Sequence, residues 1–152
     1  MIKIIIPFFL SLFGCSVIFA QTSKLKVTKA KPQAASADDI LPSIKRGKLV
    51  YANYCLTCHQ EDGGGVPNLN PPLIQTSFVI GDKDVLIKII LNGFNEHVDI
   101  DGESYSNNMP SFNSLKDQQI ADVLAYIRNN FGNKASPIIS ADVQKIRYSA
   151  KN

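Results

Sequence analysis

Five consecutive residues place two cysteines and a histidine close together in the sequence. They are Cys55-Leu56-Thr57-Cys58-His59. Two residues separate the thiols, and the imidazole follows the second thiol directly, so the three side chains serve one local site. The sequence has 3 cysteines, and the third, Cys15, lies in an apolar N-terminal segment. The chain downstream of that segment therefore has this one pair.

The spacing C-x-x-C-H is the signature of covalent haem attachment. Two thiols at this spacing, near the end of a helix, reach the two vinyl groups on one edge of a porphyrin. We predict one covalent haem c, with Cys55 and Cys58 as thioether donors and His59 as the proximal axial iron ligand. A ligating histidine normally donates its other ring N–H to an acceptor. The expected acceptor is a backbone carbonyl near Pro71 or Pro72.

Three other interpretations of the motif stay open at this point. A thioredoxin-like redox pair also uses C-x-x-C, but it expects a βαβ setting that this chain lacks. A structural zinc site needs four ligands, and adjacent Cys58 and His59 fit two tetrahedral corners poorly even if His97 is the fourth ligand. A plain disulfide is the simplest alternative, since exported proteins often pair their cysteines. The position of the motif near a helix end favours haem.

Elimination and local pattern identify the second axial ligand. The sequence has 2 methionines, Met1 and Met109. Met109 precedes Pro110 in an irregular stretch, and the proline stiffens the backbone there. Met109 is the predicted distal axial iron ligand, while His97 as ligand and Met109 as plain core filling stay as alternatives. Histidine–methionine ligation raises the reduction potential and leaves no open axial position, so no catalytic residue is expected.

The first twenty residues have the pattern of a signal peptide, with an apolar run over 4–19 and Ala20 before the expected cleavage point. Two alternatives stay open: lipidation at Cys15 in a weak lipobox, and an uncleaved N-terminal anchor. All three send the rest of the chain across a membrane, so we expect a periplasmic protein. Residues 21–37 are polar and lysine-rich, which predicts a flexible basic tether.

Apolar periodicity predicts helices over residues 40–56, 82–91 and 117–130, and a last short helix from a Ser140 cap to about Tyr148. A glycine- and proline-rich loop follows the cysteine motif, and Asp101-Gly102 predicts a tight turn with a small hairpin. No alternation is long enough for a larger sheet. The expected class is all-α, with a core that a buried haem would complete.

The charge distribution argues against a nucleic-acid partner. The formal net charge is +3, yet from Asp38 to the C-terminus 13 acidic residues outnumber 11 basic ones, which gives −2. Nucleic-acid-binding domains concentrate positive charge on their folded surface. Here the basic run lies in the predicted tether instead. We therefore expect no nucleic-acid partner. Contact with a membrane is expected only through the N-terminal segment, in the case where it stays attached as an anchor.

The chain from about Lys45 to Phe131 resembles a class I cytochrome c domain. The matching positions flank the haem motif and continue into the last long helix: Gly47, Tyr51, Pro72-Leu73, Met109-Pro110, Leu115 and Tyr126. The resemblance implies a cytochrome c fold, with three to five helices wrapped around one haem. It also implies that the first and last helices cross closely at Gly47, with the two tyrosines packed around it.

The implied organisation is a signal peptide at 1–20, a tether at 21–37, a cytochrome c domain at 38–136 and a C-terminal extension with a short helix at 137–152. Residues 131–137 are similar to those of cytochrome domains that accompany periplasmic dehydrogenases. This implies single-electron transfer from a dehydrogenase to an oxidase or another cytochrome. The alternative is a haem protein that binds a small ligand or peroxide after displacement of Met109.

Overall fold

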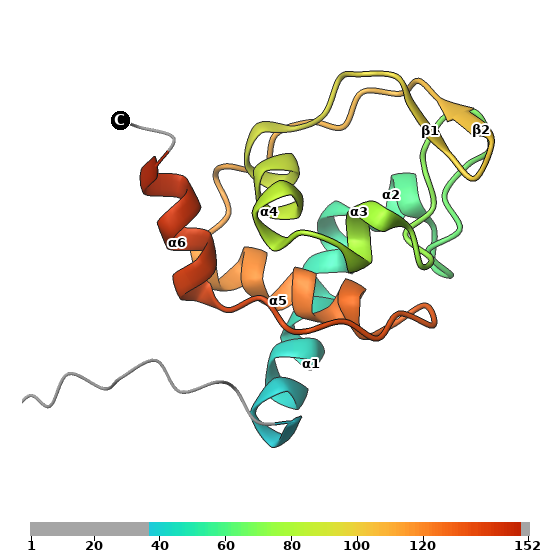
Figure 1. Ribbon diagram of the computed structural model, residues 1–152. Helices are drawn as coiled ribbons and strands as arrows, with labels where there is room; N and C mark the ends of the chain where they lie inside the picture. Colours follow the sequence, from blue (N-terminus) through green and yellow to red (C-terminus); the bar gives the residue numbers. More distant parts are fainter. Residues whose placement is uncertain (1–36, 150–152) are drawn as a thin grey trace, which may run out of the picture. The chain divides into compact units, whose positions relative to one another are not determined.

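The computed structural model describes residues 37–149, which form six helices and one short β-hairpin. Their order and arrangement are shown in Figure 1. All described residues belong to one structural unit, Ala34–Asn152. The predicted signal peptide and the tether up to residue 36 lie outside the described residues. The elements are α1 (Ala37–Tyr54), α2 (Leu56–His59), α3 (Ser77–Ile80), α4 (Lys83–Asn92), β1 (Val98–Ile100), β2 (Glu103–Tyr105), α5 (Asp117–Arg128) and α6 (Ser140–Ser149).

Helices α1 and α5 cross at close range (Figure 1), as the resemblance implies. A Cβ atom on Gly47 of α1 would lie 1.9 Å from the carbonyl oxygen of Asp122 and 2.8 Å from the Cβ of Tyr126, both on α5. Because no side chain fits there, glycine is required at the crossing. The rings of Tyr51 and Tyr126 pack beside it with centroids 5.3 Å apart. This crossing fixes the helix that delivers the cysteine motif.

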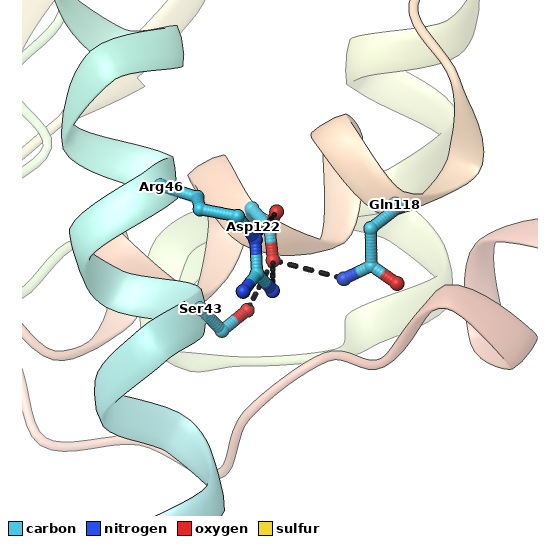
Figure 2. Close-up of polar contacts among 4 residues, drawn as sticks. All are labelled: Ser43, Arg46, Gln118 and Asp122. Atoms are coloured by element: carbon cyan, nitrogen blue, oxygen red, sulfur yellow. Dashed lines mark hydrogen bonds and ion pairs between the residues drawn. The ribbon is translucent and has the colours of Figure 1, made fainter.

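A buried carboxylate ties the two crossing helices together. Figure 2 shows Asp122 receiving hydrogen bonds from Ser43 and Arg46 of α1 and from Gln118 of α5. The Arg46 guanidinium donates through Nε at 2.7 Å and through a terminal nitrogen at 2.8 Å. Burial alone would raise the pKa of Asp122, but these hydrogen bonds outweigh it and hold the pKa below its usual value.

Local signals set the ends of α4 as predicted. The Asp82 side chain caps the helix by accepting hydrogen bonds from the backbone N–H groups of Asp84 and Val85, at 2.7 and 3.2 Å. Gly93 ends the helix with a φ of 78°, a left-handed conformation that favours glycine. The predicted turn at Asp101-Gly102 is also confirmed, because it joins the antiparallel strands β1 and β2.

The N-terminal helix differs from its prediction at both ends. It begins at Ala37 rather than residue 40, so Pro42 lies inside it, not in its first turn. It ends at Tyr54, and the last four residues of the cysteine motif form the separate helix α2, with Cys55 as its N-cap. Helices α2 and α3 have four residues each, which is too short for the apolar periodicity that reveals a helix in a sequence.

Helix α5 is buried on all sides from Ile120 to Arg128, beyond the single apolar stripe that its sequence shows. It ends at Arg128, two residues before the predicted end. Its neighbours are α1, α6 and α3, and its remaining surface faces the cavity described below. The predicted Ser140 cap of α6 is wrong, because Ser140 is already helical and the Asp142 carboxylate instead accepts the Ile139 N–H at 3.1 Å. Within the described part of the chain, no helix is long and apolar enough to cross a membrane.

Candidate haem-binding site

One cavity brings together the four site residues predicted from the sequence: Cys55, Cys58, His59 and Met109. Its empty volume, including the part open to solvent, is about 1070 Å³. Elements from α1 to α5 contribute to its wall, which is mostly apolar and includes Leu73, Phe78, Leu86, Ile90, Phe94 and Phe112. His97 does not line it and is exposed.

The junction of α1 and α2 delivers the cysteine motif to the cavity. The N–H of Cys55 donates to the Tyr51 carbonyl at 2.9 Å, and the N–H of His59 donates to the Cys55 carbonyl at 2.9 Å. The chain leaves α2 at Gln60, whose φ is 63°. The Tyr51 hydroxyl donates to the Gln60 carbonyl at 2.6 Å. Tyr51, a buried residue of α1, thus holds both the start and the exit of the motif.

The His59 ring has one nitrogen engaged and one free for a ligand. Its Nδ1 lies 3.0 Å from the carbonyl oxygen of Pro71, which confirms the predicted acceptor. The carbonyl can only accept, so Nδ1 carries the proton and Nε2 keeps its lone pair. Burial lowers the pKa of His59, against a smaller opposing effect of the Pro71 hydrogen bond. The ring is therefore neutral, as an iron ligand must be.

The glycine-rich loop places the Pro71 carbonyl. Gly65 has a φ of +69°, and a Cβ atom there would lie 2.3 Å from the Asn70 carbonyl oxygen and 2.7 Å from that of Pro71. The N–H of Gly65 donates to the His59 carbonyl at 3.1 Å. The loop therefore folds back over the end of α2 at a distance that glycine alone permits.

The two thiols of the motif are free. Cys55 is buried and Cys58 is partly exposed. Burial, with a further contribution from Cys58, raises the pKa of the Cys55 thiol to about 12. Zinc ligation by both cysteines with His59 and His97 does not fit, because His97 lies outside the cavity.

Met109 is held by the segment that follows α4. Its backbone pairs with that of Phe94 through hydrogen bonds of 2.9 and 2.8 Å. A Cβ atom on Gly93 would lie 2.6 Å from the Met109 carbonyl oxygen. Gly93 therefore has two roles: it ends α4, and it permits the close approach of the Met109 backbone.

Two buried polar residues position the cavity wall, and no sequence pattern predicted a role for either. Asn133 donates to the carbonyls of Leu73 and Ile127, each at 2.8 Å, and accepts the Gln75 N–H at 2.7 Å. It thereby fixes the wall segment after Pro72 to the end of α5. A single asparagine in a polar turn carries no sequence signal for this role.

Arg128 does the same for α3. Its guanidinium, 2% exposed, donates to the carbonyls of Val79 and Gly81 at 2.6 and 3.2 Å, and Nε donates to the Ser136 carbonyl at 2.9 Å. Burial lowers the pKa of Arg128. Its position in the last turn of α5 carries no sequence signal for this role.

The donor set and the cavity fit a c-type haem. Two free thiols, a neutral imidazole with Nε2 unengaged among the described residues, and a thioether share a wall that is otherwise mostly apolar. None of the residues that line this cavity is Asp, Glu, Lys or Arg. An apolar macrocycle with one metal ion is the cofactor that such a wall and such donors suit.

Comparison with known proteins agrees with this chemistry. The family model for cytochrome c matches residues 44–131. Cytochrome c-552 of Thermus thermophilus is 34% identical over 110 residues, which cover 66% of this chain and 83% of that protein. The cytochrome c subunit of the quinone alcohol dehydrogenase of Gluconacetobacter polyoxogenes is 36% identical over 111 residues, which cover 66% of this chain.

The match to dehydrogenase subunits is partial on their side. The chain covers 22% of the Gluconacetobacter subunit. It covers 24% of the gluconate 2-dehydrogenase cytochrome c subunit of Pantoea cypripedii, with 35% identity over 105 residues. By contrast, it spans most of the Thermus protein. The chain therefore belongs to the cytochrome c family: it is an electron carrier with one covalent haem c, and it is not itself a catalyst.

Proposed function

We propose that Cys55 and Cys58 bind the haem through thioether bonds and that His59 Nε2 and the Met109 sulfur are its axial ligands. The observation that carries this proposal is the hydrogen bond of His59 Nδ1 to the Pro71 carbonyl at 3.0 Å. It leaves Nε2 unengaged in a cavity that both cysteines and Met109 also line.

With both axial positions filled, the haem supplies a one-electron couple and no open site for substrate. The chain's residues then orient the ligands and exclude water. The Pro71 carbonyl holds the His59 ring, the Phe94 pairing holds Met109, and the apolar wall keeps the local dielectric low. Methionine ligation and a low dielectric both favour the reduced form, so a comparatively high reduction potential is expected.

The wall also argues against a peroxidase role. Peroxide cleavage needs an acid–base group beside the open axial position. Among the described residues that line the cavity, the one titratable imidazole belongs to His59, and its Nδ1 is already bonded. His97, which could have served as a distal base or as a rival ligand, is exposed and outside the cavity.

The ligation is tested by the visible spectrum of the ferric holoprotein and of two single variants. A weak far-red iron–sulfur band is expected in the parent protein. Met109→Ala abolishes that band, and the matched variant His97→Ala retains it. Absence of the band from the parent, with a low-spin ferric spectrum that His97→Ala converts to high spin, would instead assign the sixth position to the histidine.

We further propose that the protein works in the periplasm and takes electrons from a dehydrogenase, passing them to an oxidase or another cytochrome. The support is the signal-peptide pattern of residues 1–20 and the names of the dehydrogenase subunits that this chain resembles. Redox encounters of this class bury less than about 1,200 Å².

The location is tested by fractionating a bacterium that expresses the full chain with haem-maturation machinery. Intact mass spectrometry of the red periplasmic fraction is expected to give a chain that begins at Gln21 and carries one haem. Haem protein confined to the cytoplasm would contradict this location, whereas a lipid-modified mass that begins at Cys15 would keep the location and overturn the predicted cleavage after Ala20.

A further inference from the structure

Arg147 lies on α6, beyond the residues that match the cytochrome c family model, yet it contacts the segment that carries Met109. Its terminal guanidinium nitrogens donate to the carbonyl oxygens of Asn113 and Leu115, at 2.7 and 2.8 Å. Its Nε donates to Asp117 Oδ1 at 2.7 Å. One side chain thus binds three residues of the stretch that runs from Met109 to α5.

The opposite side of the same stretch is fastened to α4. The Ser111 hydroxyl donates to the Leu91 carbonyl at 2.5 Å, and the Phe112 N–H donates to the Ile90 carbonyl at 2.9 Å. Helix α6 itself packs against both α4 and α5 (Figure 1). The Met109 segment is therefore held between the end of α4 on one side and Arg147 on the other.

The geometry calls for a guanidinium. A planar fork reaches two carbonyls and a carboxylate at the same time, whereas a lysine ammonium presents a single charged point. The arginine side chain is 22% exposed and that of Asp117 is 23% exposed, so their hydrogen bonds are only partly open to water. Charge-assisted hydrogen bonds in such surroundings are stronger than neutral ones.

We propose that Arg147 is a positioning residue for the sixth iron ligand, because it restrains the segment whose opening would withdraw Met109 from the iron. The proposal rests on the ligation by Met109 proposed above. Opening of this segment is a local unfolding step, and its population is set by the contacts that break. Loss of the Arg147 contacts leaves the α4 side alone to resist opening, so the open form becomes more populated.

The test is imidazole binding to the ferric holoprotein, which reports the open form because imidazole replaces the methionine sulfur. The apparent affinity scales with the fraction of protein in the open form. Arg147→Met is expected to raise that affinity about ten-fold, the order expected when charge-assisted hydrogen bonds are lost. It is also expected to lower the reduction potential, because the open form lacks methionine ligation.

The matched control is Lys145→Met. Lys145 lies on the same helix, is exposed, and its side chain makes no hydrogen bond among the described residues, so the charge change is the same without the contacts. Its imidazole affinity and potential are expected to stay near those of the parent. An affinity of Arg147→Met within two-fold of Lys145→Met would overturn the proposal.

Arg147→Lys keeps the charge and keeps the test decisive if the methionine variant does not fold. It is expected to bind imidazole more tightly than the parent while its far-UV circular dichroism stays the same; an unchanged affinity would overturn the proposal. Failure of the ligation proposal has a separate signature, since the far-red iron–sulfur band would then be absent from the parent protein itself.

Discussion

The His59 ring owes its orientation to the backbone of the loop that follows it. The Pro71 carbonyl accepts from Nδ1, and Gly65 passes so close to this carbonyl that a Cβ atom would meet it at 2.7 Å. No charged side chain takes part. A carbonyl acceptor leaves the imidazole less basic than a carboxylate would, which keeps the ligand neutral.

Gly65→Ala tests this at the residue scale. The left-handed φ costs about 1–2 kcal/mol for alanine, and the clash with two backbone carbonyls adds about 1–3 kcal/mol. Denaturant unfolding of the ferric holoprotein is expected to show a loss of about 2–5 kcal/mol. The reduction potential is expected to shift as well, because the Pro71 carbonyl moves.

Gly102→Ala is the matched control for that variant. Gly102 also has a positive φ, +85°, but a Cβ atom there meets nothing within 4 Å. Its loss of about 1–2 kcal/mol then measures the backbone conformation alone. Equal losses in the two variants would show that the approach of Gly65 to Pro71 is unimportant.

The crossing of α1 and α5 is the main contact between helices, and only part of it could be predicted from the sequence. Gly47, Tyr51 and Tyr126 could be matched to a crossing by resemblance. The burial of Asp122 could not be predicted, because it depends on Arg46, which lies 76 residues away in the sequence. Similarly, the capping residue Asp82 and the terminating residue Gly93 indicate the ends of α4 in the sequence. The four-residue helices α2 and α3 have no such pattern.

Asp122→Asn tests the carboxylate that joins these helices. The pKa of Asp122 is lowered in the folded protein, so its carboxylate stabilises the fold above the unfolded pKa of about 3.9, and this contribution is lost as the pH falls through the lowered pKa. The variant is expected to be less stable by about 2 kcal/mol at pH 7. The difference from the parent is expected to shrink as the pH falls below about 4.

The measurement is urea unfolding at a series of pH values, with Asp84→Asn as control. Asp84 is exposed and its side chain makes no hydrogen bond among the described residues, so its variant is expected to lose much less stability at pH 7 than Asp122→Asn. A difference for Asp122→Asn that stays constant from pH 7 to pH 3 would contradict the ionic role of the cluster.

For the molecule as a whole, short motifs predicted the residues that we propose bind the haem. The residues that hold the segments around the cavity in place could not be predicted. The five-residue motif and the lone downstream methionine identified four residues that the cavity does bring together. Arg128, Asn133 and Arg147 fix the segments around the cavity through backbone carbonyls that are 32 to 60 residues away in sequence. Every residue has a backbone carbonyl, so a hydrogen bond to one requires no particular residue type and gives no pattern in a single sequence.

Charge is distributed unevenly along the chain. Residues 49–82 and 89–115, which supply most of the cavity wall, contain no Lys or Arg. They contain seven acidic residues: Glu61, Asp62, Asp82, Glu96, Asp99, Asp101 and Glu103. Oxidation of the reduced holoprotein by a cationic cobalt complex is therefore expected to slow as ionic strength rises, while oxidation by anionic hexacyanoferrate speeds up. Stopped-flow rates with the opposite pair of slopes would contradict this picture.

With His59 and Met109 as the proposed axial ligands, the haem iron has no open position, so the protein moves electrons and binds nothing else at the iron. This is tested by a spectroelectrochemical titration of the full-length holoprotein, carried out under argon and repeated under carbon monoxide. One reversible one-electron couple with the same midpoint potential is expected under both gases. A midpoint potential that rises under carbon monoxide, with a changed reduced spectrum, would show that the sixth position is accessible and that Met109 does not close it.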